Sequence, residues 1–333
     1  MKLIAEIGVN HNGCVDLARN LIDAAHEAGA DCVKFQSFNA DKLARLRTPK
    51  VGYQELSVEK SLTHHKMLKQ LEMSSQNLMS LKKYCEKVGI QFLSTPYDLV
   101  SAQDLHSIGC RQFKMASADL VDYQLHCYLA SIDADVLIST GMGSLGEIES
   151  ALECYKASAA RITLLHCTSN YPCSDASINL NMIKTLRSAF GVEVGFSDHS
   201  IGSEAAIVAA SMGASVIEKH FTLDKKMVGP DHRASIEPDE LKLLSQSLKR
   251  VGAMLGSSVK KVQEEEFGMR QISRKSLVAK KNIKFGDIFD QESFTAMRPG
   301  DGLSPMNLPD FIGKRAARDI VSGDNIWWSD LDG

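Results

Sequence analysis

The chain has 333 residues, of which 44% are hydrophobic and 24% are charged, and its formal net charge is -3 at pH 7. This is the composition of an ordinary soluble globular protein, and the small negative charge gives no sign of a nucleic-acid or membrane-surface partner. No apolar run reaches the length of a membrane span, and the apolar part of the N-terminus is too short for a secretory signal. The eight Cys form no C-x-x-C pair, which indicates reduced thiols, and we expect a cytoplasmic protein.

Apolar runs of strand length recur along the first three quarters of the chain. They are nearly continuous rather than alternating, which is typical of strands that are covered on both faces. The runs occupy residues 3–8, 32–37, 90–95, 112–117, 135–140, 161–168, 192–197 and 215–221.

Helical patterns lie between these runs, at residues 15–29, 75–89, 144–158, 202–214 and 237–255. Their apolar residues recur with a period near 3.6. Gly29 and Gly89 are placed to end the first two helices, and Ser144 with Glu147 has the spacing of a capping box.

Regular alternation of strands and helices over residues 1–256 predicts an α/β fold with a parallel sheet. Eight such units match the roughly 250 residues of a (β/α)8 TIM barrel. An open doubly wound sheet is the alternative, but it would favour a glycine-rich first turn, and "GVNHNG" lacks that spacing.

Two segments depart from the alternation. Residues 37–73 form a long insert rich in Lys and Arg, which is typical of an active-site loop or, alternatively, of a solvated surface excursion. Residues 257–273 are polar and predict a linker, whereas the short strands and turn signals of residues 274–333 predict a small β-rich domain.

All eight predicted strands end in polar residues, and in a TIM barrel these ends converge on one mouth. Lys34 and Lys114 lie inside such runs, at "VKFQ" and "FKMAS", and lysine is disfavoured in a buried strand unless it is paired. Two buried ammonium groups require an anion, and nearby hydroxyls make phosphate plus carboxylate the natural partner. Each serine taken alone is more often structural, and it is the set that is informative. The hydroxyls belong to Thr95, Ser117, Ser139 and Ser197.

Two histidines, His199 and His220, end the seventh and eighth strands, which are neighbours in a closed barrel. Imidazoles at such positions can share one divalent cation, with water or substrate completing an open shell. Glu218 lies two residues before His220 and points to the same side, so it could deprotonate a bound water. The alternative is one core histidine and one exposed histidine. No metal role is assigned to the histidines at positions 11, 64, 65, 106, 126 and 232.

Ordered motifs across the chain resemble the sialic acid synthase family. In the barrel these are "AEIGVNHNG", "AGADCVKFQ", "FLSTPYD", "FKMASAD", "LISTGM", "LLHCTSNYP", "GFSDHSIG", "VIEKHFTLD" and "GPDHRAS". In the C-terminal part, "RKSLVAKKNIKFGD", "MRPGDGLSP" and "IGKRAARDI" resemble the antifreeze-like SAF domain of the same family.

The resemblance implies an N-acetylneuraminate synthase-type transferase. Such an enzyme condenses phosphoenolpyruvate with the open-chain aldehyde of an N-acetylated hexosamine, here expected to be N-acetylmannosamine. With water, the products are a nine-carbon 2-keto acid and phosphate, released by C–O cleavage. The resemblance also implies Mn²⁺ as cofactor, with Mg²⁺ or Co²⁺ as substitutes, held by His199 and His220.

The resemblance further assigns roles to residues of this chain. Glu6 or Glu218 would aid the addition of water. The carboxylate of phosphoenolpyruvate would bind to Lys34, Thr95 and Lys114. Its phosphate would bind to Ser117, Ser139 and Ser197. The sugar would contact Glu6, Gln36, Tyr171 and Asp231. Ser169 stands on the phosphate side, where some members carry Asn. Arg298 would reach from the SAF domain into the barrel of a second subunit, which implies a domain-swapped homodimer.

Several alternatives remain open at this point. A legionaminic acid synthase would use 2,4-diacetamido-2,4,6-trideoxymannose, and the insert at residues 37–73 could supply the apolar niche for its second acetamido group. A pseudaminic acid synthase would use a diacetamido-altrose. A metal-dependent hydrolase on the same barrel would not explain the paired strand lysines, and a non-enzymatic binder would not need the polar mouth.

Overall fold

The structure, a computed structural model, describes residues 1–45 and 63–332. The chain forms two compact units, Met1–Gly256 and Ser257–Gly333, which are described separately. Within the described residues, no helix combines the length and the apolar character that crossing a membrane would require.

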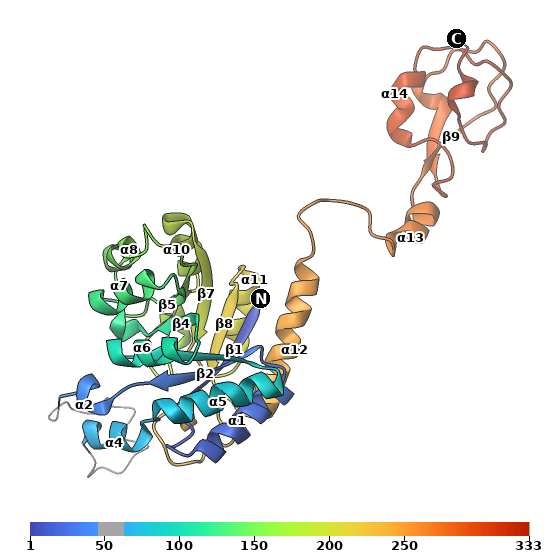
Figure 1. The fold of residues 1–333 in the computed structure, drawn as a ribbon. Helices are drawn as coiled ribbons and strands as arrows, with labels where there is room; N and C mark the ends of the chain where they lie inside the picture. Colours follow the sequence, from blue (N-terminus) through green and yellow to red (C-terminus); the bar gives the residue numbers. More distant parts are fainter. Residues whose placement is uncertain (46–62, 333) are drawn as a thin grey trace. The chain divides into compact units, whose positions relative to one another are not determined.

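The first unit is built on eight parallel strands (Figure 1). They are β1 (Lys2–Gly8), β2 (Cys32–Ser37), β3 (Gln91–Pro96), β4 (Gln112–Met115), β5 (Asp135–Ser139), β6 (Ile162–His166), β7 (Glu193–Asp198) and β8 (Val216–His220). The strand order is β3-β2-β1-β8-β7-β6-β5-β4, and β3 also lies against β4. Because β3 and β4 stand at the two ends of this order and lie against each other, the sheet curls into a near-barrel. The predicted TIM-like fold is confirmed, and each strand overlaps the run that predicted it.

Helices surround this sheet. They are α1 (Val15–Glu27), α2 (Ala40–Leu43), α4 (His64–Leu71), α5 (Ser75–Val88), α6 (Leu99–Ser107), α7 (Tyr123–Ser131), α8 (Leu145–Glu153), α9 (Asp175–Ile178), α10 (Met182–Phe190), α11 (Glu204–Ser211) and α12 (Pro238–Leu255). Gly89 ends α5 with φ of 89°, a left-handed conformation that favours glycine. The predicted capping box is present in α8, where Ser144 and Glu147 each accept a hydrogen bond from the other's backbone N–H.

The interior of the barrel is divided into an apolar layer and a polar layer. The apolar layer consists of Ile4, Cys32, Leu93, Leu137, Leu165 and Val216. Because side chains of a strand alternate between its faces, the residues two positions further along point inward again, and most of them are polar. That second layer is Glu6, Lys34, Thr95, Ser139, Cys167 and Glu218. The apolar layer therefore closes the barrel beneath a polar mouth.

The insert after β2 is described in part, and residues 46–62 lie outside the described residues. Its two described helices, α2 and α4, are joined by a small apolar cluster that also includes residues of the strand ends. The cluster is formed by Val9, Phe38, Ala40, Met67, Leu68 and Leu71.

The second unit has its own small core around Phe289, Phe294 and Phe311. Strands β9 (Ser276–Ala279) and β10 (Phe294–Met297) pair in antiparallel fashion, and α13 (Glu266–Ser273) and α14 (Leu308–Phe311) complete the regular elements. Helix α13 falls within the stretch that was expected to be a linker. Its side chains are polar or exposed, so the sequence carries no buried apolar stripe that would reveal a helix.

Candidate active site

One cavity of about 470 Å³ lies at the carboxyl ends of the strands of the first unit. It is lined by every predicted site residue except Arg298, namely Glu6, Lys34, Gln36, Thr95, Lys114, Ser117, Ser139, Ser169, Tyr171, Ser197, His199, Glu218, His220 and Asp231. A second hollow of about 530 Å³, lined by residues that include Lys2, Gln91 and Arg161, contains none of them. The chemistry of the polar mouth is therefore concentrated in one place.

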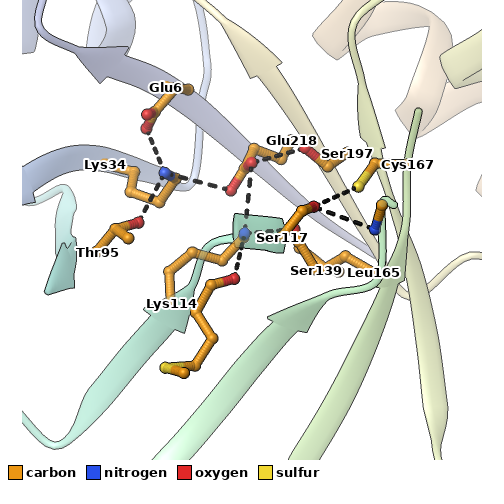
Figure 2. Close-up of polar contacts among 12 residues, drawn as sticks. Glu6, Lys34, Thr95, Lys114, Ser117, Ser139, Leu165, Cys167, Ser197 and Glu218 are labelled. Atoms are coloured by element: carbon orange, nitrogen blue, oxygen red, sulfur yellow. Dashed lines mark hydrogen bonds and ion pairs between the residues drawn. The ribbon is translucent and has the colours of Figure 1, made fainter. Parts of the chain in front are cut away.

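Lys34 forms one half of the cavity floor (Figure 2). Its ammonium group lies 2.8 Å from Oε2 of Glu6 and 3.8 Å from Oε2 of Glu218, and it donates a hydrogen bond of 3.0 Å to Oγ1 of Thr95. Burial lowers the pKa of Lys34, but the two carboxylates outweigh that effect and raise it. Lys34 is consequently a fixed positive charge that is held between acidic partners.

Lys114 forms the other half of the floor. Its ammonium group donates to the hydroxyl of Ser139 and to the carbonyl oxygen of Met115, and lies 4.0 Å from Oε1 of Glu218 (Figure 2). Burial is the main reason that its pKa is lowered, and Lys34 adds to the effect. A buried anion would therefore favour the charged form of this lysine.

Two buried carboxylates lie in opposite electrostatic environments. Burial raises the pKa of Glu218, but Lys114 and Lys34 outweigh it and lower that pKa to about 2. Glu218 also accepts a hydrogen bond of 2.8 Å from Ser197. For Glu6, burial raises the pKa despite the nearby Lys34, and Gln36 donates to its Oε1 at 2.9 Å. Lys114 and Lys34 therefore hold Glu218 in its charged form, whereas burial favours the neutral form of Glu6.

A hydroxyl-lined recess adjoins Lys114. The hydroxyl of Ser117 accepts a hydrogen bond of 3.1 Å from the backbone N–H of Gly141 and lies 3.1 Å from Sγ of Cys167. A Cβ at Gly141 would collide with Ser169 Oγ and would come within 2.8 Å of Ser117 Oγ. Glycine is thus required at this position, because the backbone approaches both hydroxyls closely.

His199 is held in one tautomer. Its Nδ1 lies 2.7 Å from the carbonyl oxygen of Thr168, which can only accept, so Nδ1 carries the proton. Burial lowers the pKa of the ring to about 4, so Nε2 is unprotonated. Ser197 Oγ lies 3.2 Å from Nε2, but its one proton is donated to Glu218. The lone pair of Nε2 therefore lacks a donor and is available to a cation.

His220 faces the same place from β8. The two rings have centroids 5.6 Å apart, and Tyr171 lies 4.1 Å from the ring of His199 and 5.4 Å from that of His220. Nδ1 of His220 is buried without a hydrogen bond and lies 3.7 Å from Oδ2 of Asp231. Burial raises the pKa of Asp231 to about 7. Burial also lowers the pKa of His220. Two neutral imidazoles, each with a nitrogen that lacks a hydrogen-bond donor, are suitable ligands for one divalent cation.

The sequence analysis missed two components of the cavity. Asp119, in the short helix that follows β4, lines the cavity, and its Oδ2 is buried without a hydrogen bond. An apolar wall, defined here as Phe38, Leu43, Met67, Leu68 and Leu71, covers another side. Neither has a local signal, because a single Asp after a strand and a helix with an apolar stripe are both ordinary.

Arg298 lies at the end of β10 in the second unit and is exposed. It is the one predicted site residue that belongs to the second unit, and its role in the cavity stays a prediction.

The chain is similar to known proteins over nearly its whole length. Residues 21–260 match the NeuB family and residues 274–332 match the SAF domain. The chain is 42% identical to the N,N'-diacetyllegionaminic acid synthase of Campylobacter jejuni (97% of this chain, 98% of the relative). It is 39% identical to the enzyme of that name from Legionella pneumophila (99% and 94%). The crystal structure of N-acetylneuraminic acid synthetase from Leptospira borgpetersenii has a TM-score of 0.72 at 33% identity (80% and 89%). The chain belongs to the NeuB family, and its NeuB region is followed by a SAF domain.

Proposed function

We propose that the chain condenses phosphoenolpyruvate with the open-chain aldehyde of an N-acetylated hexosamine and water, giving a nine-carbon 2-keto acid and phosphate. The observation that carries this proposal is the floor of the cavity, where Lys34 and Lys114 flank Glu218 beside two neighbouring imidazoles. Cationic, hydroxyl-lined recesses bind phosphate and carboxylate, and the imidazoles provide a place for a Lewis acid.

The two ends of phosphoenolpyruvate have matching partners. Lys114 and the recess of Ser117, Ser139 and Ser169 would bind the phosphate, since they offer one ammonium group and several hydroxyl donors in a buried place. Lys34 and Thr95 would bind the carboxylate, 3.0 Å from each other. Donors fixed before the substrate arrives stabilise a departing phosphate without reorganisation during the reaction.

The histidine pair fits a divalent cation, which we propose to be Mn²⁺, with Mg²⁺ or Co²⁺ as substitutes. His199 and His220 would hold it, and within residues 1–45 and 63–332 no group of three or more His, Cys, Asp or Glu side chains forms a fuller ligand set. Such an ion, when bound, polarises an aldehyde carbonyl as a Lewis acid.

The remaining chemistry falls to side chains of the chain itself. Carbon 3 of phosphoenolpyruvate forms the new bond to the aldehyde carbon with the electron pair of its double bond, and the aldehyde oxygen takes up a proton to become a hydroxyl. Water then adds at carbon 2 and loses one proton, and its second proton leaves with the phosphate when the keto group forms at carbon 2. Glu6 and Glu218 are the buried carboxylates beside Lys34. We assign the first of the water's protons to Glu6, because Lys114 and Lys34 hold Glu218 in its charged form. The C–O bond to phosphate then breaks, and Lys114 with its neighbouring hydroxyls stabilises the anion that leaves.

The apolar wall bears on the choice of sugar. Phe38, Leu43, Met67, Leu68 and Leu71 offer no hydrogen bonds to sugar hydroxyls but can cover methyl groups. A 2,4-diacetamido-2,4,6-trideoxymannose carries a second acetamido methyl and a 6-methyl group. N-acetylmannosamine, which the sequence alone favours, has hydroxyls at both places. We therefore infer that the diacetamido sugar is the substrate, in line with the names of the relatives from Campylobacter jejuni and Legionella pneumophila.

The test is phosphate release from phosphoenolpyruvate with Mn²⁺ and each of three sugars: the diacetamido mannose, N-acetylmannosamine and the diacetamido altrose. Release that is fastest with the diacetamido mannose supports the proposal, and preference for another sugar transfers it to that substrate. If no phosphate is released with any of the three sugars, the chain does not carry out the condensation, and a binder or a hydrolase is favoured.

A variant of the wall sharpens this experiment. Met67→Gln places an amide against the methyl groups, so the KM for the diacetamido mannose is expected to rise about tenfold, with no change in the KM for phosphoenolpyruvate. Met79→Gln, on an exposed part of α5, is the matched control and is expected to change neither constant.

A further inference from the structure

The strands that carry the two imidazoles are also joined by a buried ion pair. Asp198 and Lys219 are partners in the register of β7 and β8, and Nζ of Lys219 lies 2.8 Å from Oδ2 of Asp198. Both side chains are only 1% exposed. The residues that point the same way from these strands, Phe196 and Ile217, are members of the apolar core. A charged pair thus occupies a region where apolar packing is the rule.

Strand alternation places this pair on the side opposite to the cavity. Lys219 lies between Glu218 and His220, and both of those line the cavity, so Lys219 points away from it. Asp198 lies between Ser197 and His199, which also line the cavity, and points away for the same reason. Neither member of the pair can touch a substrate or a cation in the cavity.

The pair holds both neighbours of His199. Oδ1 of Asp198 accepts hydrogen bonds from the backbone N–H of Ser200 at 2.8 Å and from its hydroxyl at 2.6 Å. The ammonium group of Lys219 donates to the carbonyl oxygen of Ser200 at 2.6 Å. The residues before and after His199 are therefore tied to the residue immediately before His220.

Stability alone is a weak reason for such a pair. Removing two charges from water costs about as much as their attraction returns, and apolar residues of similar volume often stabilise a protein equally well. What an apolar pair lacks is direction, because hydrogen bonds to charged groups fix both distance and angle. Metal ligands need this kind of support, since a site that is loose by about 0.5 Å loses its function.

We propose that the Lys219–Asp198 pair is a positioning device that sets the separation of the His199 and His220 imidazoles, and thereby the affinity of the site for a divalent cation. This inference rests on the proposed function, because it requires that the two imidazoles hold that cation.

The test measures the binding of Mn²⁺ to the full-length chain without substrate. The electron paramagnetic resonance signal of free Mn²⁺ reports how much of the ion remains unbound. The variant Asp198→Leu/Lys219→Met replaces the pair by apolar side chains and leaves no unpaired charge. We expect it to keep a Tm near that of the wild type, and to keep phosphoenolpyruvate binding, while its Kd for Mn²⁺ rises about tenfold. If this variant does not fold, Asp198→Asn/Lys219→Gln replaces it, with the same direction of change expected.

A matched control exists on the other side of the barrel. The hydroxyls of Ser37 and Ser94 join β2 and β3 at 2.7 Å, are buried, and lie outside the cavity lining. Ser37→Ala/Ser94→Ala is expected to leave the Kd for Mn²⁺ within about twofold of the wild type.

The outcomes separate this inference from the proposed function. If a folded Asp198→Leu/Lys219→Met chain binds Mn²⁺ as tightly as the wild type does, the positioning role is wrong and the metal site stands. If the wild-type chain binds no Mn²⁺ and its phosphate release survives chelation, both the positioning role and the metal dependence are wrong.

Discussion

The ammonium group of Lys34 lies 2.8 Å from the carboxylate of Glu6, and both side chains are buried at the floor of the cavity. A pair of this kind is costly to break from one side, because the remaining charge is left without a partner. The two residues are nevertheless assigned different roles, substrate binding for Lys34 and proton transfer for Glu6, so substitutions should separate them.

Glu6→Gln is expected to lower kcat by about 10²-fold or more while leaving the affinity for phosphoenolpyruvate nearly unchanged. Lys34→Met is expected to raise the Kd for phosphoenolpyruvate at least about tenfold, because it removes the carboxylate's charged partner. Phosphate release gives kcat, and calorimetry with phosphoenolpyruvate gives the Kd. A Glu6→Gln chain with wild-type kcat would refute the assignment of Glu6 to proton transfer.

The close approach of the Gly141 backbone to two serine hydroxyls predicts that a substitution there weakens phosphate binding. A Cβ there would crowd Ser117 and Ser169, so Gly141→Ala should raise the Kd for inorganic phosphate and the KM for phosphoenolpyruvate about tenfold. Gly146, in the first turn of α8, has open space around its Cβ position. Gly146→Ala is therefore the control, and it should leave both constants unchanged while slightly raising the Tm. Equal effects of the two substitutions would show that the recess does not bind phosphate.

Asp119 predicts a dependence of stability on pH. Burial, followed by the nearby Asp122, raises the pKa of Asp119 to about 7 from an ordinary value of 3.8. A raised carboxyl pKa means that the folded state binds the proton more tightly than the unfolded state does. The associated stability is present below the ordinary pKa and is lost as the pH rises through about 7.

The substitution Asp119→Asn replaces the carboxyl by a group that does not ionise, so the stability is no longer lost as the pH rises. The variant should have a Tm close to that of the wild type at pH 4 and a Tm higher by about 3 °C at pH 8. Asp16→Asn, on an exposed part of α1, should show no such growth of the difference with pH. A difference for Asp119→Asn that stays constant between the two pH values would mean that this carboxyl is not protonated in the folded protein.

Much of the site could be predicted because barrel geometry converts strand order into proximity. Lysines inside apolar runs, at positions 34 and 114, were informative since a buried ammonium group needs partners, and the structure provides them in Glu6, Glu218 and nearby hydroxyls. His199 and His220 were informative because they stand at the ends of β7 and β8, which are neighbouring strands.

Other features depend on contacts that no local pattern encodes. Lys219 and Asp198 look like ordinary charges at strand ends, and only the β7–β8 register reveals that they pair in the core. The apolar wall brings together residues from the segments before and after residues 46–62, so it requires the folded insert. The role of Arg298 in the cavity stays a prediction, because Arg298 belongs to the second unit and the cavity to the first.

His220→Ala tests the cation directly. The substitution removes one of two imidazoles, so Mn²⁺ binding, measured by the resonance signal of free Mn²⁺, should weaken at least about 100-fold. The fold should persist, since Nδ1 of the ring makes no hydrogen bond. His106→Ala is a control on α6, where the ring contacts Tyr128 far along the chain from both ligands. Activity of purified His220→Ala that equals the wild type after chelation would refute the metal assignment.

Arg298 gives the last prediction, which concerns the proposed domain-swapped homodimer. If Arg298 of one subunit completes the cavity of its partner, two inactive chains can restore each other. The two chains to be mixed are the variants Arg298→Ala, which keeps all cavity residues of the first unit, and Glu218→Gln, which keeps Arg298. In an equal, randomly paired mixture half of the dimers are mixed, and each mixed dimer has one complete site, so activity should reach about one quarter of the wild-type level.

The matched control pairs the wild type with the double variant Arg298→Ala/Glu218→Gln under the same conditions. With swapping, only wild-type dimers have complete sites, which again gives about one quarter of the activity. If Arg298 instead served its own cavity, the first mixture would be inactive and the control would retain about one half, because every wild-type subunit would work regardless of its partner. The two mixtures together therefore distinguish action in the partner from action within one chain, and the swapped arrangement fails if the first mixture shows no phosphate release.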